Sequence, residues 1–330
     1  MIIHLKKGLA KSQAIRIAAE LEALHFTQND QEILVTSSKL KSLPEHYQSL
    51  AEQTFVMDSD IQLASRSYLP KRKVEFGACQ IGDPENTLMI AGPCSIESWE
   101  QITSAAQLLK NLGLSTLRAG CFKPRTSPYT FQGLGEEGLK MLVKVREEFG
   151  LKIITEVKDS THVDQVIEHT DIIQIGAKAM YDQGILRKCG QIQKPVLLKR
   201  GFGSTLQEFV QAAEFILSQG NPNVILCERG IRTFEDKTRF TLDLTGVAYL
   251  KEYTNLPIVV DPSHAMGYRY GVPDLTRAAI AMGVDGLLIE THPTPEKALS
   301  DAAQQLNFEE FEKLYHSLKP IANAIGRNLI

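Results

Sequence analysis

Two groups of side chains in this sequence have the chemistry of a reaction site. Members of the first group are cations, and guanidinium and ammonium groups suit phosphate and carboxylate oxygens. Brought together by a fold, they predict a substrate that carries several negative charges. The group consists of Arg118, Lys123, Arg125, Lys199 and Arg229, with Lys178, Arg200 and Arg269 as further candidates.

The densest part of this cationic group lies in the stretch LRAGCFKPRTSPYTFQGLGEEG, residues 117–138. Its prolines stiffen the loop, and Thr126, Ser127 and nearby backbone N–H groups can complete a site for an oxyanion. The net charge of the whole chain is only -3 at pH 7. The cations therefore indicate a local site, and we expect neither nucleic acid nor a membrane as a partner.

The second group could bind a divalent metal ion. It combines a thiol, an imidazole and two carboxylates, namely Cys94, His264, Glu290 and Asp301. A mixed set of this kind suits Mn, Fe, Co or Zn better than Mg or Ca. The four positions form no local motif, so a structural interpretation stays open, with Asp301 as a helix N-cap and Glu290 in a salt bridge.

Short apolar segments precede most of these side chains. From Leu88 onward eight of them alternate with stretches of helix length: LMIAGPCS, STLRAGCF, KIITEVKD, DIIQIGAK, PVLLKRGF, NVILCERG, PIVVDPSH and GLLIETHP. Continuous apolar strands of this kind are typical of a parallel sheet that is buried on both faces. Eight repeats in about 240 residues predict a (β/α)8 TIM barrel, whose active site lies at the C-terminal ends of the strands. A doubly wound open sheet is the alternative, but no G-x-G-x-x-G follows any strand.

The first 68 residues have a different pattern. Strand-like MIIHLK, EILVTSS and TFVMDS alternate with helix-like KSQAIRIAAELEALH and LPEHYQSLAEQ, and FTQND could add a short strand. This order predicts a small ferredoxin-like α+β domain over residues 1–68. The linker YLPKRK and the hairpin KVEFGACQIGD would then open a catalytic barrel domain over residues 69–330.

Other features narrow the class of protein. The five cysteines are scattered and lack CxxC spacing, which argues against a disulfide framework or a zinc ribbon. The start MIIHLKKGLAKSQ has no signal-peptide pattern, and no run of about 18 apolar residues occurs. We therefore expect a cytoplasmic protein.

Motifs of the barrel segment resemble those of one enzyme family. They are AGPCS, LRAGCFKPRTSPYTFQGLG, IIQIGA, LLKRGF, ILCERGIRTFE, VDPSH and HPTPEKALSD. In this order they resemble the 3-deoxy-D-arabino-heptulosonate 7-phosphate (DAHP) synthases of the type I beta class. The likeness covers essentially the whole barrel, whereas the first segment is only loosely similar to the ferredoxin-like regulatory domain of some members. The resemblance implies condensation of phosphoenolpyruvate (PEP) with D-erythrose 4-phosphate and water to give DAHP and phosphate, the first step of the shikimate pathway to aromatic amino acids.

The resemblance also implies a role for each candidate residue. Cys94, His264, Glu290 and Asp301 would be the metal ligands. PEP would be held by Arg118, Lys123, Lys199 and Arg229, with Lys178 where the family has an arginine. The sugar phosphate would be held by Arg125, Thr126 and Ser127. Lys123 would donate a proton to the nascent alkoxide, for which a water on the metal is the alternative, and Lys123 and His264 are the expected catalytic residues.

Some positions depart from the family pattern. Lys178 and Ala179 replace the usual Arg-Asn pair, Phe240 stands where Asn is common, and Ala302 replaces Gly. These changes could alter the affinity for PEP and the identity of the aldehyde substrate. Two alternatives to a DAHP synthase therefore stay open. One is a PEP-dependent synthase for another phosphorylated aldose, of the 3-deoxy-octulosonate 8-phosphate type, whose loop usually reads Lys-Ala-Asn-Arg-Ser-Ser. The other is a non-catalytic regulatory barrel.

The small domain suggests allosteric regulation. It could bind an aromatic amino acid effector and close over the barrel mouth, coupling the end product to the entry step. A solubilising or oligomerising appendage is an equally simple interpretation. Barrels of this family are commonly tetrameric, so we expect a homo-oligomer, most simply a homotetramer.

Overall fold

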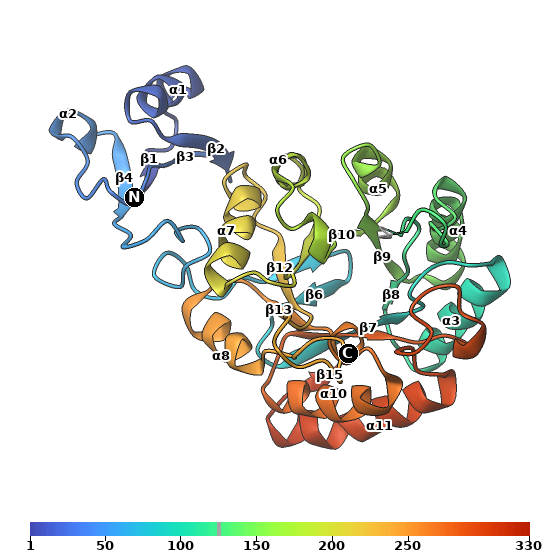
Figure 1. The fold of residues 1–330 in the computed structure, drawn as a ribbon. Helices are drawn as coiled ribbons and strands as arrows, with labels where there is room; N and C mark the ends of the chain where they lie inside the picture. The colour runs from blue at the N-terminus through green and yellow to red at the C-terminus, as the bar shows by residue number, and fades with distance from the viewer. Residues whose placement is uncertain (124–126) are drawn as a thin grey trace.

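A closed parallel barrel forms the larger part of the computed structural model, which describes residues 1–123 and 127–330 (Figure 1). Its strand order runs from β14 back to β7, and β14 also pairs with β7, which closes the sheet. The predicted (β/α)8 barrel is therefore confirmed. The barrel strands are β7 (Asn86–Gly92), β8 (Thr116–Arg118), β9 (Lys152–Val157), β10 (Ile172–Ile175), β11 (Val196–Lys199), β12 (Val224–Glu228), β13 (Ile258–Val260) and β14 (Gly286–Glu290).

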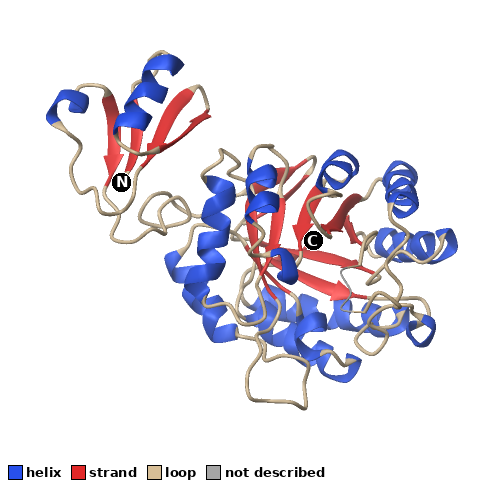
Figure 2. Ribbon diagram, turned by 45° about the horizontal axis from the view of Figure 1, so that its top comes forward, coloured by secondary structure: helices blue, strands red, loops and turns tan. Residues whose placement is uncertain are grey.

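Helices surround these strands, as Figure 2 shows in blue around red. Several begin at the caps that their sequences supply: Thr205 and Asn307 each form a capping box with a glutamate three residues later. The helices are α3 (Trp99–Asn111), α4 (Glu136–Phe149), α5 (Val163–His169), α6 (Gln183–Gly190), α7 (Leu206–Leu217), α8 (Leu244–Tyr253), α9 (Pro262–Met266), α10 (Val272–Ala281) and α11 (Phe308–Ala324). Short 3-10 turns η1 (Ala177–Ala179), η2 (Arg269–Gly271) and η3 (Pro295–Lys297) and the edge strand β15 (Asn328–Leu329) complete this part.

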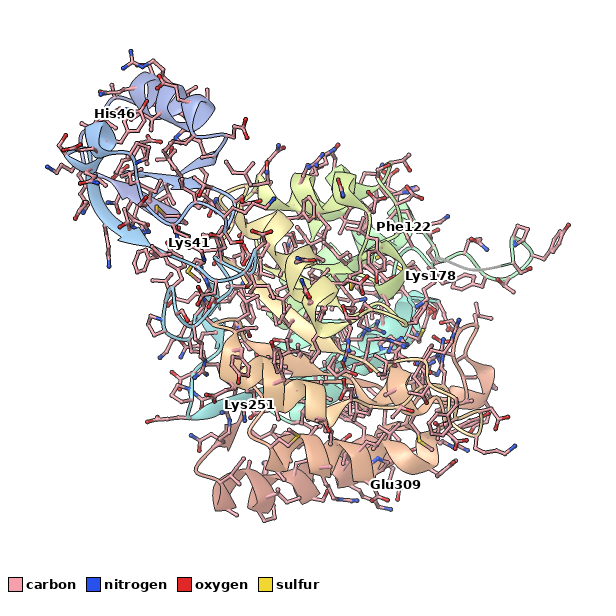
Figure 3. The ribbon with its side chains drawn as sticks, turned by 60° about the vertical axis from the view of Figure 1, so that its left-hand side comes forward. Lys41, His46, Phe122, Lys178, Lys251 and Glu309 are labelled. Atoms are coloured by element: carbon pink, nitrogen blue, oxygen red, sulfur yellow. The ribbon has the colours of Figure 1, made fainter. Side chains whose placement is uncertain are left out.

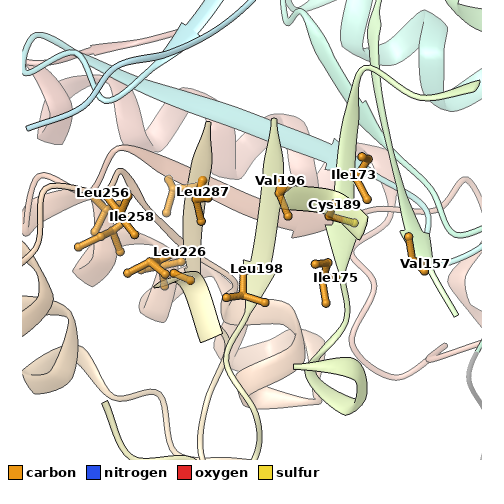
Figure 4. Close-up of a cluster of buried hydrophobic side chains, with 14 of the residues drawn as sticks. Val157, Ile173, Ile175, Cys189, Val196, Leu198, Leu226, Leu256, Ile258 and Leu287 are labelled. Atoms are coloured by element: carbon orange, nitrogen blue, oxygen red, sulfur yellow. The ribbon is translucent and has the colours of Figure 1, made fainter. Parts of the chain in front are cut away.

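Each barrel strand buries both of its faces. Outward-facing side chains such as Ile173, Val196 and Leu198 pack under the helices (Figure 4). Alternate side chains point inward, and the hairpin of β5 (Val74–Phe76) and β6 (Cys79–Ile81) packs against them and plugs the amino end of the barrel. The opposite end, where the strands terminate, is thereby left for the site.

The small domain has the predicted ferredoxin-like order. Its elements are β1 (Ile2–Leu5), α1 (Lys11–Glu20), β2 (Leu24–Gln28), β3 (Gln31–Val35), α2 (Glu45–Gln48) and β4 (Ala51–Phe55), and the sheet order is β2-β3-β1-β4 with antiparallel pairing. Two predicted helices are shorter than expected. Helix α1 ends early because the following residues pair with β3, and α2 keeps only four residues because the next segment pairs with β1.

The small domain lies against the amino-end side of the barrel. Glu214 of α7 accepts hydrogen bonds from the backbone N–H groups of Gln62 (2.7 Å), Leu63 (3.2 Å) and Ala64 (2.8 Å), which follow the last strand of the small domain. The side chain of Asn255, which follows α8, donates to the carbonyl of Leu63 at 2.9 Å. Both contacts lie at the C-terminal ends of helices, α7 before β12 and α8 before β13, and therefore at the amino end of the barrel. The structure therefore shows the small domain away from the barrel mouth, and the expected closure over the mouth stays a prediction.

Figure 3 also shows the small domain apart from the strand ends: His46 of the small domain and Lys178 at the strand ends lie on opposite sides of the view. No helix among the described residues is long and apolar enough to cross a membrane.

Glu214 should make the stability of the protein depend on pH. Burial raises its pKa from 4.5 to about 7, although the three N–H donors oppose this shift. The folded state therefore holds a proton that the unfolded state has lost, and the free energy of unfolding should fall by roughly 2–3 kcal/mol as pH rises from 4.5 to 7. Denaturant titrations of wild type and Glu214→Gln across this range should show a flatter profile for the variant, and parallel profiles would contradict the assignment.

Candidate active site at the strand ends

The alternation of the strands carries the polar side chains into the barrel mouth. Inward-facing apolar residues occupy the lower layer: Leu88, Ile90, Ile154, Ile172, Leu197, Ile225, Cys227, Val259 and Leu288. Two residues beyond such a position stand Glu156, Lys199, Arg229, Asp261 and Glu290. Since side chains two apart in a strand share a face, the register that packs the lower layer also directs these groups into the mouth.

A cavity of about 370 Å³ opens at this end of the barrel. It is lined by Lys123, Ser127, Thr130, Glu156, Ala177, Lys178, Lys199, Phe202, Arg229, Arg239, His264 and Asp301. No lining residue comes from the small domain among the described residues. Five of the side chains are cationic, which suits a substrate with several negative charges.

The predicted metal ligands converge beside this cavity. Ligand atoms of Cys94, Glu290 and Asp301 lie within 4.8 Å of one another. His264 stands just outside that group, with its Nε2 atom 3.4 Å from Glu290 Oε1. The structure thus brings the four side chains to one place, three of them tightly and the fourth at its edge.

The charges around this set fit a bound cation. Burial and the neighbouring Glu290 raise the pKa of the Cys94 thiol to about 12, while the ammonium of Lys123 lies 3.0 Å from its sulfur. Burial alone would raise the pKa of Asp301, but His264 and Lys123 hold it below its ordinary value. Two carboxylates and a thiol this close in a buried place favour a positive charge among them. The donor set therefore fits a divalent ion.

Asp261 fixes the orientation of His264. Its Oδ2 atom lies 2.7 Å from His264 Nδ1 and accepts a hydrogen bond from Lys199 Nζ at 2.6 Å. Burial would raise the pKa of Asp261, but His264 and Lys199 hold it well below its ordinary value. A carboxylate on Nδ1 places the ring proton there and leaves the Nε2 lone pair free to bind a metal.

Sequence comparison assigns a family to this arrangement. A profile of the DAHP synthetase I family matches residues 60–326, most of the chain. The chain belongs to the DAHP synthetase I family. A phospho-2-dehydro-3-deoxyheptonate aldolase of Thermotoga maritima is 48% identical over 266 residues, which are 80% of this chain and 78% of that protein.

Structural comparison agrees with this assignment to the DAHP synthetase I family. The crystal structure of the Thermotoga maritima DAHP synthase superposes with a TM-score of 0.81 at 39% identity and covers 100% of this chain and 99% of that one. The likeness therefore includes the small domain. A 2-dehydro-3-deoxyphosphooctonate aldolase of Stenotrophomonas maltophilia is 33% identical over 257 residues, 72% of this chain and 92% of that protein.

The cations predicted from the DAHP synthetase I resemblance fall into three sets. Lys123, Lys178, Lys199 and Arg229 line the cavity, as does Ser127. Arg118 is buried below it and donates to Glu290 Oε1 at 2.7 Å and to the Cys94 carbonyl at 3.2 Å. Arg125 and Thr126 lie outside the described residues.

Two further candidate cations belong to other contacts. Arg200 is buried and donates to Glu228 (2.9 Å) and Asp243 (2.8 Å) rather than facing the cavity. Arg269 pairs at the surface with Glu296 at 2.9 Å. Strand-end position alone could not distinguish Arg200 from the cavity set, and Arg269 lies in η2, beyond α9.

Sequence reasoning gave no role to several residues around the site, although it noted position 240 as a departure from the family pattern. Phe240 stacks on Phe202 with ring centroids 5.1 Å apart, and the Arg229 guanidinium lies 4.2 Å from the Phe240 centroid. The departure at position 240 thus supports a cavity cation through a cation–π contact. Arg239 also lines the cavity but lies in a long loop that has no periodic signal.

Proposed function

We propose that this chain catalyses the condensation of PEP with D-erythrose 4-phosphate and water, which gives DAHP and phosphate. The observation that carries the proposal is a cationic cavity that adjoins a buried thiol, imidazole and carboxylate set in a member of the DAHP synthetase I family. The reaction would serve as the first step of aromatic amino acid biosynthesis.

PEP would bind through the cations of the cavity. Lys123, Lys178, Lys199 and Arg229 present charges to its phosphate and carboxylate. Arg118 would reach PEP from below, and its buried Nε donor has no hydrogen-bond partner within the described parts of the chain. An unpaired buried donor is costly, so an anion oxygen within reach would stabilise it. The lysine at position 178 gives a point charge in place of a bidentate fork.

The sugar phosphate would bind at the loop after β8. Ser127 lines the cavity and supports this assignment, while Arg125 and Thr126 keep their predicted roles from the family resemblance.

The chemistry follows from these positions. The C3 methylene of PEP attacks the aldehyde carbon, a C–C bond forms, and the carbonyl electron pair moves to the aldehyde oxygen. The Lys123 ammonium gives that oxygen its proton. Water adds to the cationic C2 and releases a proton, and cleavage of the C2–O bond then expels phosphate and leaves the ketone. A bound divalent ion, Mn, Fe, Co or Zn, would supply Lewis-acid polarisation of the aldehyde, held by Cys94, His264, Glu290 and Asp301.

Loss of PEP absorbance on addition of D-erythrose 4-phosphate tests the proposal. We expect consumption with Mn(II), none after a chelator, and none in Cys94→Ala, because that variant lacks the sulfur ligand. Cys189→Ala is the matched control, since Cys189 is equally buried but lies in α6. Consumption that survives both the chelator and Cys94→Ala would overturn metal dependence.

The same assay separates the alternatives. Consumption only with other phosphorylated aldoses would favour the octulosonate type, which the 33% identical relatives represent. No consumption with any aldose would favour a non-catalytic barrel. The Pro-Arg-Thr sequence after Lys123 argues against the octulosonate type. The convergence of the four predicted metal donors argues against a non-catalytic barrel.

We further propose that residues 1–68 form a regulatory domain on a cytoplasmic homotetramer of barrels formed by residues 69–330. A cavity of about 480 Å³ between the small domain and α7 supports effector binding, with Leu24, Val35 and Phe215 as apolar walls and Asp60 as an acceptor for an ammonium group. The PEP assay repeated with phenylalanine, tyrosine and tryptophan tests it, and no inhibition by any of them would favour a solubilising or oligomerising appendage.

A further inference from the structure

The segment that carries Asp301 is bound tightly to the end of β14. Leu306 donates its N–H to the carbonyl of Glu290 at 3.0 Å, and its own carbonyl accepts from His292 N at 2.9 Å. Asp301 itself has a φ of 44°, in the left-handed region. A strained backbone of this kind persists only where its surroundings hold it.

Gln304 in this segment bridges two charged side chains. It is 1% exposed, its Nε2 donates to Glu290 Oε2 at 2.6 Å, and its Oε1 accepts from Arg239 at 2.6 Å. The amide can face only one way, because the guanidinium only donates and the carboxylate only accepts. Since Arg118 holds Glu290 Oε1, both oxygens of this carboxylate are positioned by hydrogen bonds.

Gln305 bridges two stretches of backbone. It is fully buried, its Oε1 accepts from the N–H of Cys94 at 2.9 Å, and its Nε2 donates to the carbonyl of Ser300 at 2.9 Å. The hydroxyls of Ser95 and Ser300 lie 2.6 Å apart beside it. Gln305 therefore joins the backbone of one metal ligand to the residue that precedes another.

We propose that Gln304 and Gln305 are further positioning residues of the metal centre, an inference that rests on the proposed function. Gln304 holds the carboxylate of Glu290, and Gln305 holds the Cys94 backbone at a fixed distance from the Asp301 segment. Among the described residues, neither glutamine lines the main cavity. Gln304 therefore acts through Glu290 and Arg239, and Gln305 acts through the Cys94 backbone. Outer hydrogen bonds of this kind orient ligands and tune metal affinity.

Binding of Co(II) to the metal-free protein tests the proposal. Gln304→Met keeps the volume and removes both hydrogen bonds, so the Kd for Co(II) should rise about 10- to 100-fold. The ligand-field bands of the Co(II) protein should also shift, because Glu290 changes its position. With saturating metal, kcat should fall while KM for PEP stays unchanged.

Gln62→Met is the matched control, since Gln62 is 4% exposed and bridges Thr36 and the N-terminal amine far from the site. It should leave Co(II) affinity and bands unchanged. If Gln304→Met does not fold, Gln304→Ser leaves polar space for a water and should give a smaller rise in Kd.

The outcomes are distinguishable. Wild-type affinity and spectrum in the folded variant would overturn the positioning role while leaving the proposed reaction intact. Wild-type protein that binds no Co(II) would overturn the metal centre and this inference with it.

Discussion

Lys123→Met should lower kcat for PEP consumption roughly 10²- to 10⁴-fold, the range expected when a general acid is lost. Lys123 is 6% exposed, lines the cavity and donates to Cys94 Sγ at 3.0 Å and to the Cys94 carbonyl at 3.2 Å. It thus lies between the predicted metal donors and the cavity. Methionine keeps the length of the side chain but has no proton to give to the nascent alkoxide. Steady-state kinetics with saturating Mn(II) would measure the effect.

Lys178→Met serves as the matched control for that variant. Lys178 lines the same cavity but is exposed, in the turn η1. We expect its replacement to raise KM for PEP with little change in kcat, the mark of lost binding rather than lost chemistry. Equal kcat in wild type and Lys123→Met would remove Lys123 from the proton transfer.

Asp261→Asn should reduce both metal affinity and stability. Asp261 is fully buried and accepts from Lys199 Nζ at 2.6 Å and from the backbone N–H of His264 at 3.0 Å. An amide leaves Lys199 without its counter-charge, and loss of one partner of a buried pair costs about 3–5 kcal/mol. An amide N–H facing Nδ1 would also move the imidazole proton to Nε2, the atom expected to bind the metal. Denaturation of metal-free protein and Co(II) titration would measure the two effects.

Asp285→Asn separates stability from metal binding. Asp285 is equally buried, at the amino end of the barrel, and pairs with Lys71 and with Arg327 at 3.4 Å. This variant should lose stability and keep wild-type Co(II) affinity. Equal loss of Co(II) affinity in both variants would show that general destabilisation, not the orientation of His264, is responsible.

The contribution of Asp261 to the free energy of unfolding should decrease in acid. Its pKa in the folded protein lies well below 3.8, the value expected in the unfolded chain. The stabilisation is therefore fully present above 3.8, declines as the pH falls below that value, and is lost once the pH has fallen through the lower pKa of the folded protein. Asp261→Asn should accordingly be less sensitive to acid than wild type.

Local sequence carried enough information to predict the barrel and most of its site. Each buried strand is a short apolar run, and alternation within the run decides which side chain points inward, so Lys199 and Glu290 could be assigned to the mouth before any contact was known. Among the predicted metal donors, Cys94 and Glu290 follow from the same register, whereas His264 lies in α9 and Asp301 beyond β14, and both were added by the family motifs. The salt bridge expected for Glu290 in the structural interpretation is present, to Arg118 at 2.7 Å. Ligand atoms of Cys94 and Asp301 also lie within 4.8 Å of this carboxylate, which the structural interpretation does not explain.

Contacts between distant segments settled the features that local pattern could not. Helix α2 is short because the next segment pairs with β1. The small domain lies near α7 because Glu214 accepts hydrogen bonds from the backbone that follows β4, beginning at Gln62. Arg200 and Arg229 both follow buried strands, yet one meets carboxylates and the other faces the cavity. Gln304 has no signal of its own in sequence. Periodicity specifies the face of a strand on which a side chain lies, whereas its partner depends on which distant segment folds against it.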